Sequence, residues 1–329
     1  MNGVLRLLIY EGYASEKITG ELRSVRYLLE HLDRTRFEPL VAVPAHIEAL
    51  HGTRNAPVPI EVVQPPESLR AYGGAVLRRG LFARVRTAID VFLYARQLTR
   101  FIRERRVDVI YCCSLRAVLL IGLAAAMARR PVMFFVNGQL LNPLLDRLAF
   151  VMAQRIVFQC AANRDDRYPF LRRLFRSKFA VVPSGLDLRA IQRLQASARS
   201  AEALGIDSRQ LNIIVLGLLN PEKGVDVLMR ALAPHAARIP NARLWVVGDQ
   251  LTADFNNYRR ELEQLTRELG LTEVVRFTGW RTDALELLAS MDILVHPSLS
   301  EGMPRAVLEA MALGKAVIAT RVNSPRAWQ

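Results

Sequence analysis

The stretch of residues 292–320, which reads DILVHPSLSEGMPRAVLEAMALGKAVIAT, constrains the fold of this chain more than any other. It begins with a short apolar run that ends at a His-Pro-Ser loop. Pro304 suits the first turn of a helix, where its missing N–H is not needed, and Gly314 suits the left-handed residue after the helix end. Residues 315–320 then read as a second buried strand. Because a strand, a crossover helix and another strand form the repeating unit of a doubly wound parallel sheet, this stretch predicts such a sheet.

Two carboxylates in this stretch are candidate functional groups. Glu301 lies in the loop after the first strand, at the edge where open α/β sheets bind ligands. Glu309 lies inside the predicted helix between apolar neighbours, where a carboxylate buried without partners would be destabilising. Considered alone, Glu309 is best interpreted as a helix glutamate that faces solvent.

The spacing of the two carboxylates changes that interpretation. Glu301, Gly302, Pro304 and Glu309 together resemble the E-x7-E signature of the retaining GT-B glycosyltransferases of family four. The resemblance implies two Rossmann-like domains, of which the second binds a nucleotide-sugar. It implies that Glu301, Gly302 and Met303 bind the sugar, with Glu301 also catalytic, and that Glu309 accepts hydrogen bonds from the ribose. It further implies retention of the anomeric configuration, without a metal ion or a bound cofactor.

A lysine of the second predicted domain fits the same resemblance. The loop of residues 217–224 reads GLLNPEKG and lies between a strand and a helix. Lys223 is therefore placed where backbone N–H groups and the helix dipole favour anions. Alone it is an exposed lysine; in register with the two glutamates, it resembles the catalytic family lysine that binds the donor diphosphate, flanked by Gly217 and Gly224. The family usually has an arginine where this chain has Leu218, so one of two expected cations is missing.

The first predicted domain covers residues 1–186 and the second covers residues 187–329. The first begins with a strand, a loop and a helix, but without the strict dinucleotide fingerprint G-x-G-x-x-G. Where the family usually carries a glycine pair, this chain has a threonine and Gly20. Asn137 and Gly138 follow a later strand, where relatives often have histidine and glycine. The resemblance places these three residues on the acceptor side, but an amide cannot take a proton near neutral pH, so a base role for Asn137 is not expected.

An arginine-rich segment within the first domain, residues 69–106, contains ten arginines and two acids. Apolar residues at helical spacing predict a stripe that faces the core, formed by Ala88, Val91, Ala95, Leu98 and Ile102. The opposite face mixes apolar residues with Arg96, Arg100 and Arg103. That mixture favours a membrane-surface helix and a solvated arginine-rich face about equally. Nucleic acid is a weaker alternative, because no binding motif is present.

Composition bounds the remaining alternatives. A chain of 329 residues, 51% hydrophobic, suffices for two domains with their own cores. No apolar run reaches the about 18 residues of a membrane span, and the N-terminus does not resemble a signal peptide. Three cysteines are too few for a disulfide framework and fit a reducing cytoplasm. Residues 1–190 hold 29 Lys and Arg against 16 Asp and Glu, so we expect the first half to face an anionic partner.

These features predict a glycosyltransferase that moves a sugar from a nucleotide-sugar to a lipid-linked or anionic glycan, as in cell-envelope polysaccharide synthesis. We expect it in the cytoplasm, with peripheral contact to the inner membrane face as an open alternative. A soluble phosphorylated acceptor fits equally well. Two other classes stay open, namely a GT-B nucleotide-sugar epimerase and a non-catalytic remnant that binds membrane or a partner. The remnant is considered because a family member would continue past residue 329 with a further strand and helices, so we expect a truncated second domain.

Overall fold

The computed structural model describes residues 3–12, 20–45, 58–69, 81–136, 142–160, 173–197, 201–250, 257–301 and 303–322. The chain divides into two compact units, Met1–Pro183 and Ser184–Gln329. Each unit contains a parallel sheet with helices on both faces, so the predicted α/β fold class is confirmed. No helix in the described ranges is long and apolar enough to cross a membrane.

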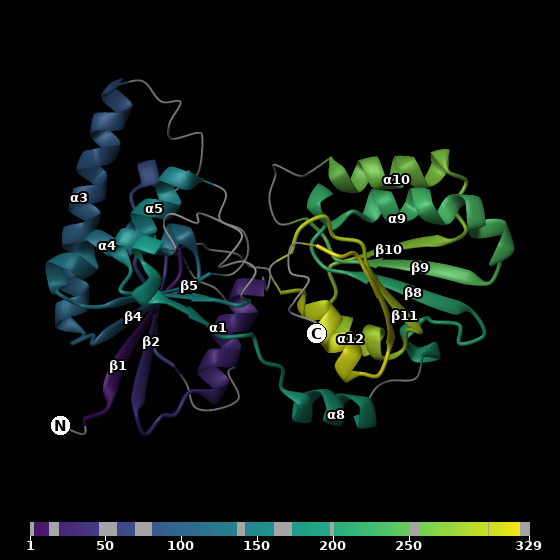
Figure 1. The fold of residues 1–329 in the computed structure, drawn as a ribbon, viewed down its shortest axis with the longest axis horizontal. Coiled ribbons are helices and arrows are strands. Elements are labelled where there is room, and N and C mark those ends of the chain that lie inside the picture. The colour runs from purple at the N-terminus through teal and green to yellow at the C-terminus, as the bar shows by residue number, and fades with distance from the viewer. Residues whose placement is uncertain are drawn as a thin grey trace. The chain divides into compact units, whose positions relative to one another are not determined.

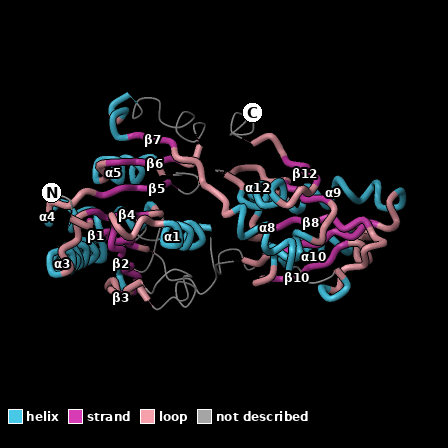
Figure 2. The backbone as a smooth tube through the Cα atoms, turned by 90° about the horizontal axis from the view of Figure 1, so that it is seen from below, coloured by secondary structure: helices cyan, strands magenta, loops and turns pink. Residues whose placement is uncertain are grey.

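The first unit is built on a seven-stranded sheet in the order β3-β2-β1-β4-β5-β6-β7, in which every pairing is parallel (Figure 2). Its strands are β1 Leu5–Tyr10, β2 Phe37–Val43, β3 Ile60–Val62, β4 Val109–Cys112, β5 Val132–Val136, β6 Arg155–Phe158 and β7 Phe179–Val181. The order of the strands reverses between β1 and β4. The carboxyl ends of these two strands therefore mark the switch point of the first sheet.

Helices cover both faces of this sheet (Figure 1). Helix α1, Gly20–His31, packs Leu22, Val25 and Leu29 against one face. The other face is covered by α3 Leu81–Glu104, α4 Leu115–Ala128 and α5 Pro143–Met152, in which α4 packs between its two neighbours. Single turns at η2 Glu67–Leu69 and η3 Arg176–Lys178 complete the described part of the unit.

Helix α3 corrects the prediction for its core-facing stripe. Ala95, Leu98 and Ile102 are buried as expected, but Ala88 is exposed and Val91 is 37% exposed. The helix has 24 residues, so at about 1.5 Å per residue it is longer than the sheet layer beneath it. Its first half extends past α4, and Val85, Ile89 and Phe92 in that half are exposed (Figure 1).

The second unit has a five-stranded parallel sheet in the order β10-β9-β8-β11-β12. Its strands are β8 Leu211–Leu216, β9 Ala242–Val247, β10 Val275–Gly279, β11 Ile293–His296 and β12 Ala316–Ala319. Its helices are α8 Leu188–Ser197, α9 Val225–Leu232, α10 Tyr258–Glu268, α11 Ala284–Ala289 and α12 Arg305–Ala312, with single turns at η4 Glu202–Leu204 and η5 Pro221–Lys223 and the longer η6 Ala233–Arg238. Helices α9 and α10 pack on one face, and α8, α11 and α12 pack on the other.

The predicted strand–loop–helix–strand unit is confirmed as β11, α12 and β12. Pro304 lies one residue earlier than expected, as the N-terminal cap of α12, and Gly314 adopts the left-handed conformation with φ of 68°. The prediction of a buried second strand is wrong. Strand β12 is at the edge of the sheet, and the side chain of Ile318 is 59% exposed. Among the described strands it pairs with β11 only, so burial there is partial.

Candidate functional site

Two loops of the second unit meet at the carboxyl ends of β8 and β11. The first loop turns through η5, where the Asn220 side chain accepts a hydrogen bond from the Lys223 backbone N–H at 3.2 Å. Gly224 follows with φ of 62°, and a Cβ atom there would lie 2.3 Å from the carbonyl oxygen of Pro297. The N–H of Leu299 donates to the carbonyl of Glu222 at 2.7 Å. These contacts hold Lys223 against the loop that follows β11.

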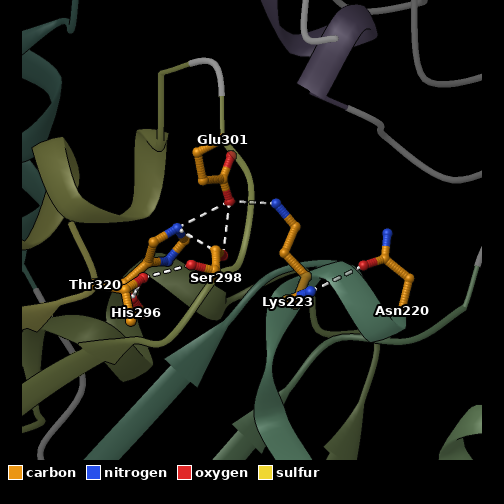
Figure 3. A network of polar contacts seen from close by, with 6 residues as sticks. All are labelled: Asn220, Lys223, His296, Ser298, Glu301 and Thr320. Carbon is orange, nitrogen blue, oxygen red and sulfur yellow. Dashed lines mark hydrogen bonds and ion pairs between the residues drawn. The ribbon is translucent and has the colours of Figure 1, made fainter. Parts of the chain in front are cut away.

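Glu301 receives three donors on a single oxygen (Figure 3). The ammonium of Lys223 forms an ion pair and a hydrogen bond with Oε1. Nε2 of His296 lies 2.9 Å from the same atom, and the Ser298 hydroxyl donates to it at 2.9 Å. Oε2 makes no hydrogen bond with any other residue that the structure describes. The carboxylate is thus held in place through one of its two oxygens.

The surroundings keep the Glu301 carboxylate ionised. Its side chain is 10% exposed and that of Lys223 is 25% exposed. Burial alone would raise the pKa of Glu301, but the hydrogen bond from His296 and the charge and hydrogen bond of Lys223 outweigh it and lower the pKa to about 2. At neutral pH Glu301 is therefore a carboxylate, and its ion pair with Lys223 is shielded from most of the solvent.

The end of β12 supports this arrangement from behind. The N–H of Thr320 donates to the carbonyl of His296 at 3.1 Å, and its hydroxyl donates to the carbonyl of Ser298. The Ser298 hydroxyl also lies 3.1 Å from Nε2 of His296. Figure 3 shows these side chains converging on Glu301 from one side and Lys223 from the other. Because strand ends fix the backbone, the position of the carboxylate is set by the fold.

Glu309 does not face solvent, although its sequence context considered alone favoured that interpretation. It is 5% exposed within α12. The hydrogen bonds of Lys223 and Glu301 do not include it. Glu309 lies about one turn into α12, whereas Glu301 lies in the loop before that helix, so the two carboxylates of the E-x7-E pattern belong to different segments.

Comparison with known proteins finds similarity in this part of the chain. Residues 210–328 match the family described as glycosyl transferases group 1. The lipopolysaccharide core biosynthesis glycosyltransferase LpsD of Rhizobium meliloti is 37% identical over 113 residues, which are 34% of this chain and 30% of the relative. An Escherichia coli protein named UDP-Gal:alpha-D-GlcNAc-diphosphoundecaprenol alpha-1,3-galactosyltransferase is 26% identical over 245 residues, 69% of this chain and 61% of that protein. The matches therefore span less than two thirds of these relatives.

Solved structures confirm the GT-B fold that the resemblance predicted. The Anabaena protein Alr3699/HepE in complex with UDP-glucose superimposes with a TM-score of 0.73 at 22% identity, over 99% of this chain and 83% of that one. The lipopolysaccharide glycosyltransferase WaaG gives a TM-score of 0.62 at 18% identity, over 99% and 83%. Identities this low establish the fold alone.

Glycines of the second unit allow its loops to approach closely. A Cβ atom at Gly248 would lie 1.7 Å from the carbonyl oxygen of Gly217, so the ends of β8 and β9 are in backbone contact. Gly248 and Gly224 thus have structural reasons to be glycine, whereas a Cβ atom at Gly217 would meet nothing within 4 Å. Leu218, at the position where an arginine was expected, is half-buried, and so is Met303. Gly302 lies outside the described residues.

His296, Ser298 and Thr320 are site residues that the sequence patterns did not predict. A signal for the first two exists, because His296 ends β11 and the two polar residues are two apart just before Glu301. Their common orientation depends on how the chain leaves the strand. That geometry is not encoded in residue type or spacing.

The acceptor-side predictions fall mostly outside the described residues. Asn137 and Gly138 are not described, and Gly20 is the first residue of α1. Arg96, Arg100 and Arg103 are exposed on α3. Nε of Arg100 donates to Glu104 at 2.7 Å, and Arg103 donates to the carbonyl of Met127 at 2.9 Å.

A buried carboxyl in the first unit also went unpredicted. Glu11 follows β1 at the switch point of the first sheet and is 2% exposed. The thiol of Cys113, which follows β4, donates to its Oε1 at 3.2 Å. Burial raises the pKa of Glu11 to about 7, although the Cys113 hydrogen bond lowers it somewhat. No pattern signalled this residue, because its burial depends on the two strand ends meeting.

Proposed function

We propose that this protein is a glycosyltransferase that moves a sugar from a nucleotide-sugar to an acceptor. The observation that carries the proposal is the Lys223–Glu301 pair at the carboxyl ends of β8 and β11. The strand order of the second sheet reverses between these two strands, and ligands of open α/β sheets bind at such switch points. A cation for the diphosphate and a carboxylate for sugar hydroxyls lie side by side there.

A uridine diphosphate sugar is the donor that we propose. Lys223 lies beside the N-terminus of α9, where backbone N–H groups point outward and the dipole favours an anion. Structural neighbours of this fold are described in complexes with UDP and with UDP-glucose. The name of the E. coli relative specifies UDP-Gal. These names support a uridine nucleotide as part of the donor. A panel of UDP-sugars would identify the sugar.

The chemistry we propose relies on charge stabilisation. The bond between the anomeric carbon and the diphosphate oxygen breaks, and the electron pair leaves with the diphosphate. Lys223 and the α9 N-terminus stabilise the negative charge that develops. Glu301 and the backbone at Met303 hold hydroxyls of the sugar, whose ring gains positive character. Glu309 binds the ribose, and the acceptor oxygen replaces the diphosphate with retention of configuration.

For the acceptor we propose a lipid-linked glycan at an anionic membrane surface. The projecting half of α3 exposes Val85, Ile89, Phe92 and Leu93, each by 50% or more. Exposed arginines at Arg86 and Arg96 adjoin them. Large apolar side chains beside exposed cations are typical of helices that lie in a membrane interface. The diphosphoundecaprenol in the name of the E. coli relative supports the same class of acceptor.

Transfer of a labelled sugar from a panel of UDP-sugars to bacterial lipid extract tests this function. We expect label in the lipid fraction with one donor, and loss of that label when Lys223 is replaced by alanine. A protein that epimerises the nucleotide-sugar without any transfer would contradict the proposal. So would a protein that binds none of the donors.

A further inference from the structure

Lys223 already has an anionic partner within its own chain. Its ammonium contacts Glu301 Oε1. In the described part of the chain, this carboxylate is the only hydrogen-bond or ion-pair partner of the Lys223 side chain. Both side chains are shielded from solvent, with 25% and 10% exposed. Any anion that binds Lys223 must therefore compete with a carboxylate that is already in place.

We propose that Glu301 is an internal counter-ion of Lys223, which the diphosphate of a donor displaces, so that the chain holds a sugar-bearing nucleotide in preference to a sugar-free one. This inference rests on the proposed function, because it takes a nucleoside diphosphate sugar as the ligand.

Glu301 is held in place independently of Lys223. His296 Nε2 and the Ser298 hydroxyl both contact Oε1 at 2.9 Å. Thr320 anchors the backbone on which these two side chains lie. When Lys223 turns to a diphosphate, the carboxylate therefore keeps two hydrogen-bond donors and its orientation. His296 and Ser298 are positioning residues in this exchange.

The exchange discriminates between donor and product. A sugar-bearing nucleotide breaks the ion pair but brings hydroxyls that hydrogen-bond to Glu301, so the carboxylate regains a partner. A sugar-free nucleoside diphosphate breaks the same pair and leaves Glu301 without that compensation. Because a carboxylate that has lost its counter-charge in a shielded site is less stable, even with two hydrogen bonds left, the free diphosphate is bound less tightly. The internal counter-ion thus favours release of the diphosphate product.

Calorimetric titration with UDP tests the competition directly. Glu301→Gln removes the competing charge but keeps the size of the side chain. We expect this variant to bind UDP about three- to tenfold more tightly than the wild type. This gain corresponds to only part of the free energy of a charge-assisted hydrogen bond. Glu222→Gln is the matched control, because Glu222 is an exposed carboxylate next to Lys223 in sequence and makes no contact with it. It should leave UDP affinity unchanged.

The ratio of the two dissociation constants, for UDP and for the UDP-sugar that the wild type prefers, tests the positioning role. His296→Leu removes the hydrogen bond to Glu301, and we expect this ratio to fall several-fold toward one. His296→Gln retains a donor and should restore much of the ratio. A merely structural effect would lower both affinities together and leave the ratio unchanged.

The outcomes separate this inference from the function on which it rests. Wild-type protein that binds no UDP and no UDP-sugar contradicts the proposed function, and the counter-ion with it. A second result contradicts only the internal counter-ion. In that result the wild type binds UDP through Lys223, and its affinity is at least as high as that of Glu301→Gln. In that case Glu301 does not compete for Lys223.

Discussion

Gly224 and Pro297 are in backbone contact across two loops that are far apart in the sequence. A Cβ atom at Gly224 would lie 2.3 Å from the carbonyl oxygen of Pro297, and the φ of Gly224 is 62°. Both the space and the backbone conformation therefore require glycine. This contact fixes the distance between the loop that carries Lys223 and the loop that carries Glu301, so it is the structural basis of the candidate site.

Replacing Gly224 by alanine should destabilise the second unit and weaken nucleotide binding together. The left-handed conformation alone costs an alanine about 1–2 kcal/mol, and the clash with Pro297 should add at least about 1 kcal/mol. Gly205→Ala is the control, because Gly205 has φ of 77° with nothing within 4 Å of the added Cβ atom. Urea denaturation of both variants measures the difference. If Gly224→Ala and Gly205→Ala lose the same stability, the contact with Pro297 does not contribute to the loss.

Glu11 should make the first unit less stable as the pH rises. Its pKa is raised from 4.5 to about 7 in the folded chain, so the folded state binds the proton more strongly than the unfolded state does. Between these two pH values the unfolded state releases the proton first. The free energy of unfolding therefore falls with increasing pH over this window, by up to about 3 kcal/mol in total.

Glu11→Gln tests this pH dependence, because the amide cannot titrate. The difference in stability between variant and wild type should shift in favour of the variant between pH 4.5 and pH 7 and then level off. Denaturant titrations across that range measure it. Glu67→Gln, at an exposed carboxyl, serves as the control and should show no such shift. A flat difference for Glu11→Gln would mean that the folded chain does not hold the proton.

The arginines of α3 should contribute to binding of anionic membranes. Basic residues near an anionic surface contribute about 1 kcal/mol each. Replacing Arg96, Arg100 and Arg103 together by glutamine should release most of the protein from vesicles that contain phosphatidylglycerol, with nucleotide binding intact. Arg96 should contribute most, because Arg100 is paired with Glu104 and Arg103 with a backbone carbonyl. Sedimentation at low and high salt provides the measurement.

Removal of the same charge elsewhere provides the control for the membrane experiment. Arg230, Arg238 and Arg276 are exposed on the second unit, and their replacement by glutamine should leave vesicle binding unchanged. Phe92→Ser should weaken binding even at high salt, because it removes an apolar contact. If both arginine triplets weaken vesicle binding equally and Phe92→Ser has no effect, the binding reflects overall charge and not α3.

Glu309 should act on the nucleoside part of the donor. Hydrogen bonds to charged groups contribute about 1.5–3 kcal/mol, so Glu309→Gln should weaken UDP binding by roughly ten- to a hundredfold. Inorganic pyrophosphate has no ribose, and its affinity should not change. Calorimetry with both ligands decides this prediction. If pyrophosphate binding is weakened as well, the substitution disturbs the structure of α12, and the loss of UDP binding does not report on a contact with the ribose.

Much of the fold could be predicted from the sequence, because each strand of the second sheet is an apolar run that ends at glycine or at a polar loop. Strands β8, β9, β10 and β11 follow these runs closely. The exposed edge at β12 could not be predicted, since Val317 and Ile318 have the composition of a buried strand. Burial depends on what covers a strand, and that is a tertiary property.

The candidate site was predictable in its charged residues only. Glu301 was found because its spacing from Glu309 resembles a known signature, and Lys223 was found because it resembles the family lysine. The structure brings Lys223 and Glu301 into contact. The hydrogen bonds of His296 and Ser298 to Glu301 depend on the turn that the chain makes after β11. Likewise, two of the five residues of the predicted stripe on α3 are exposed, because helical spacing does not show where the underlying sheet ends.

Calorimetric titration of the preferred UDP-sugar into wild-type protein and Lys223→Ala tests the central claim most directly. Lys223 is the cation that the proposal assigns to the diphosphate, and the variant removes it while the Glu301 carboxylate keeps its bonds to His296 and Ser298. We predict that the variant melts cooperatively and binds the donor roughly ten- to a hundredfold more weakly than the wild type. Equal affinity in the two proteins would contradict the assignment of this site to the nucleotide-sugar.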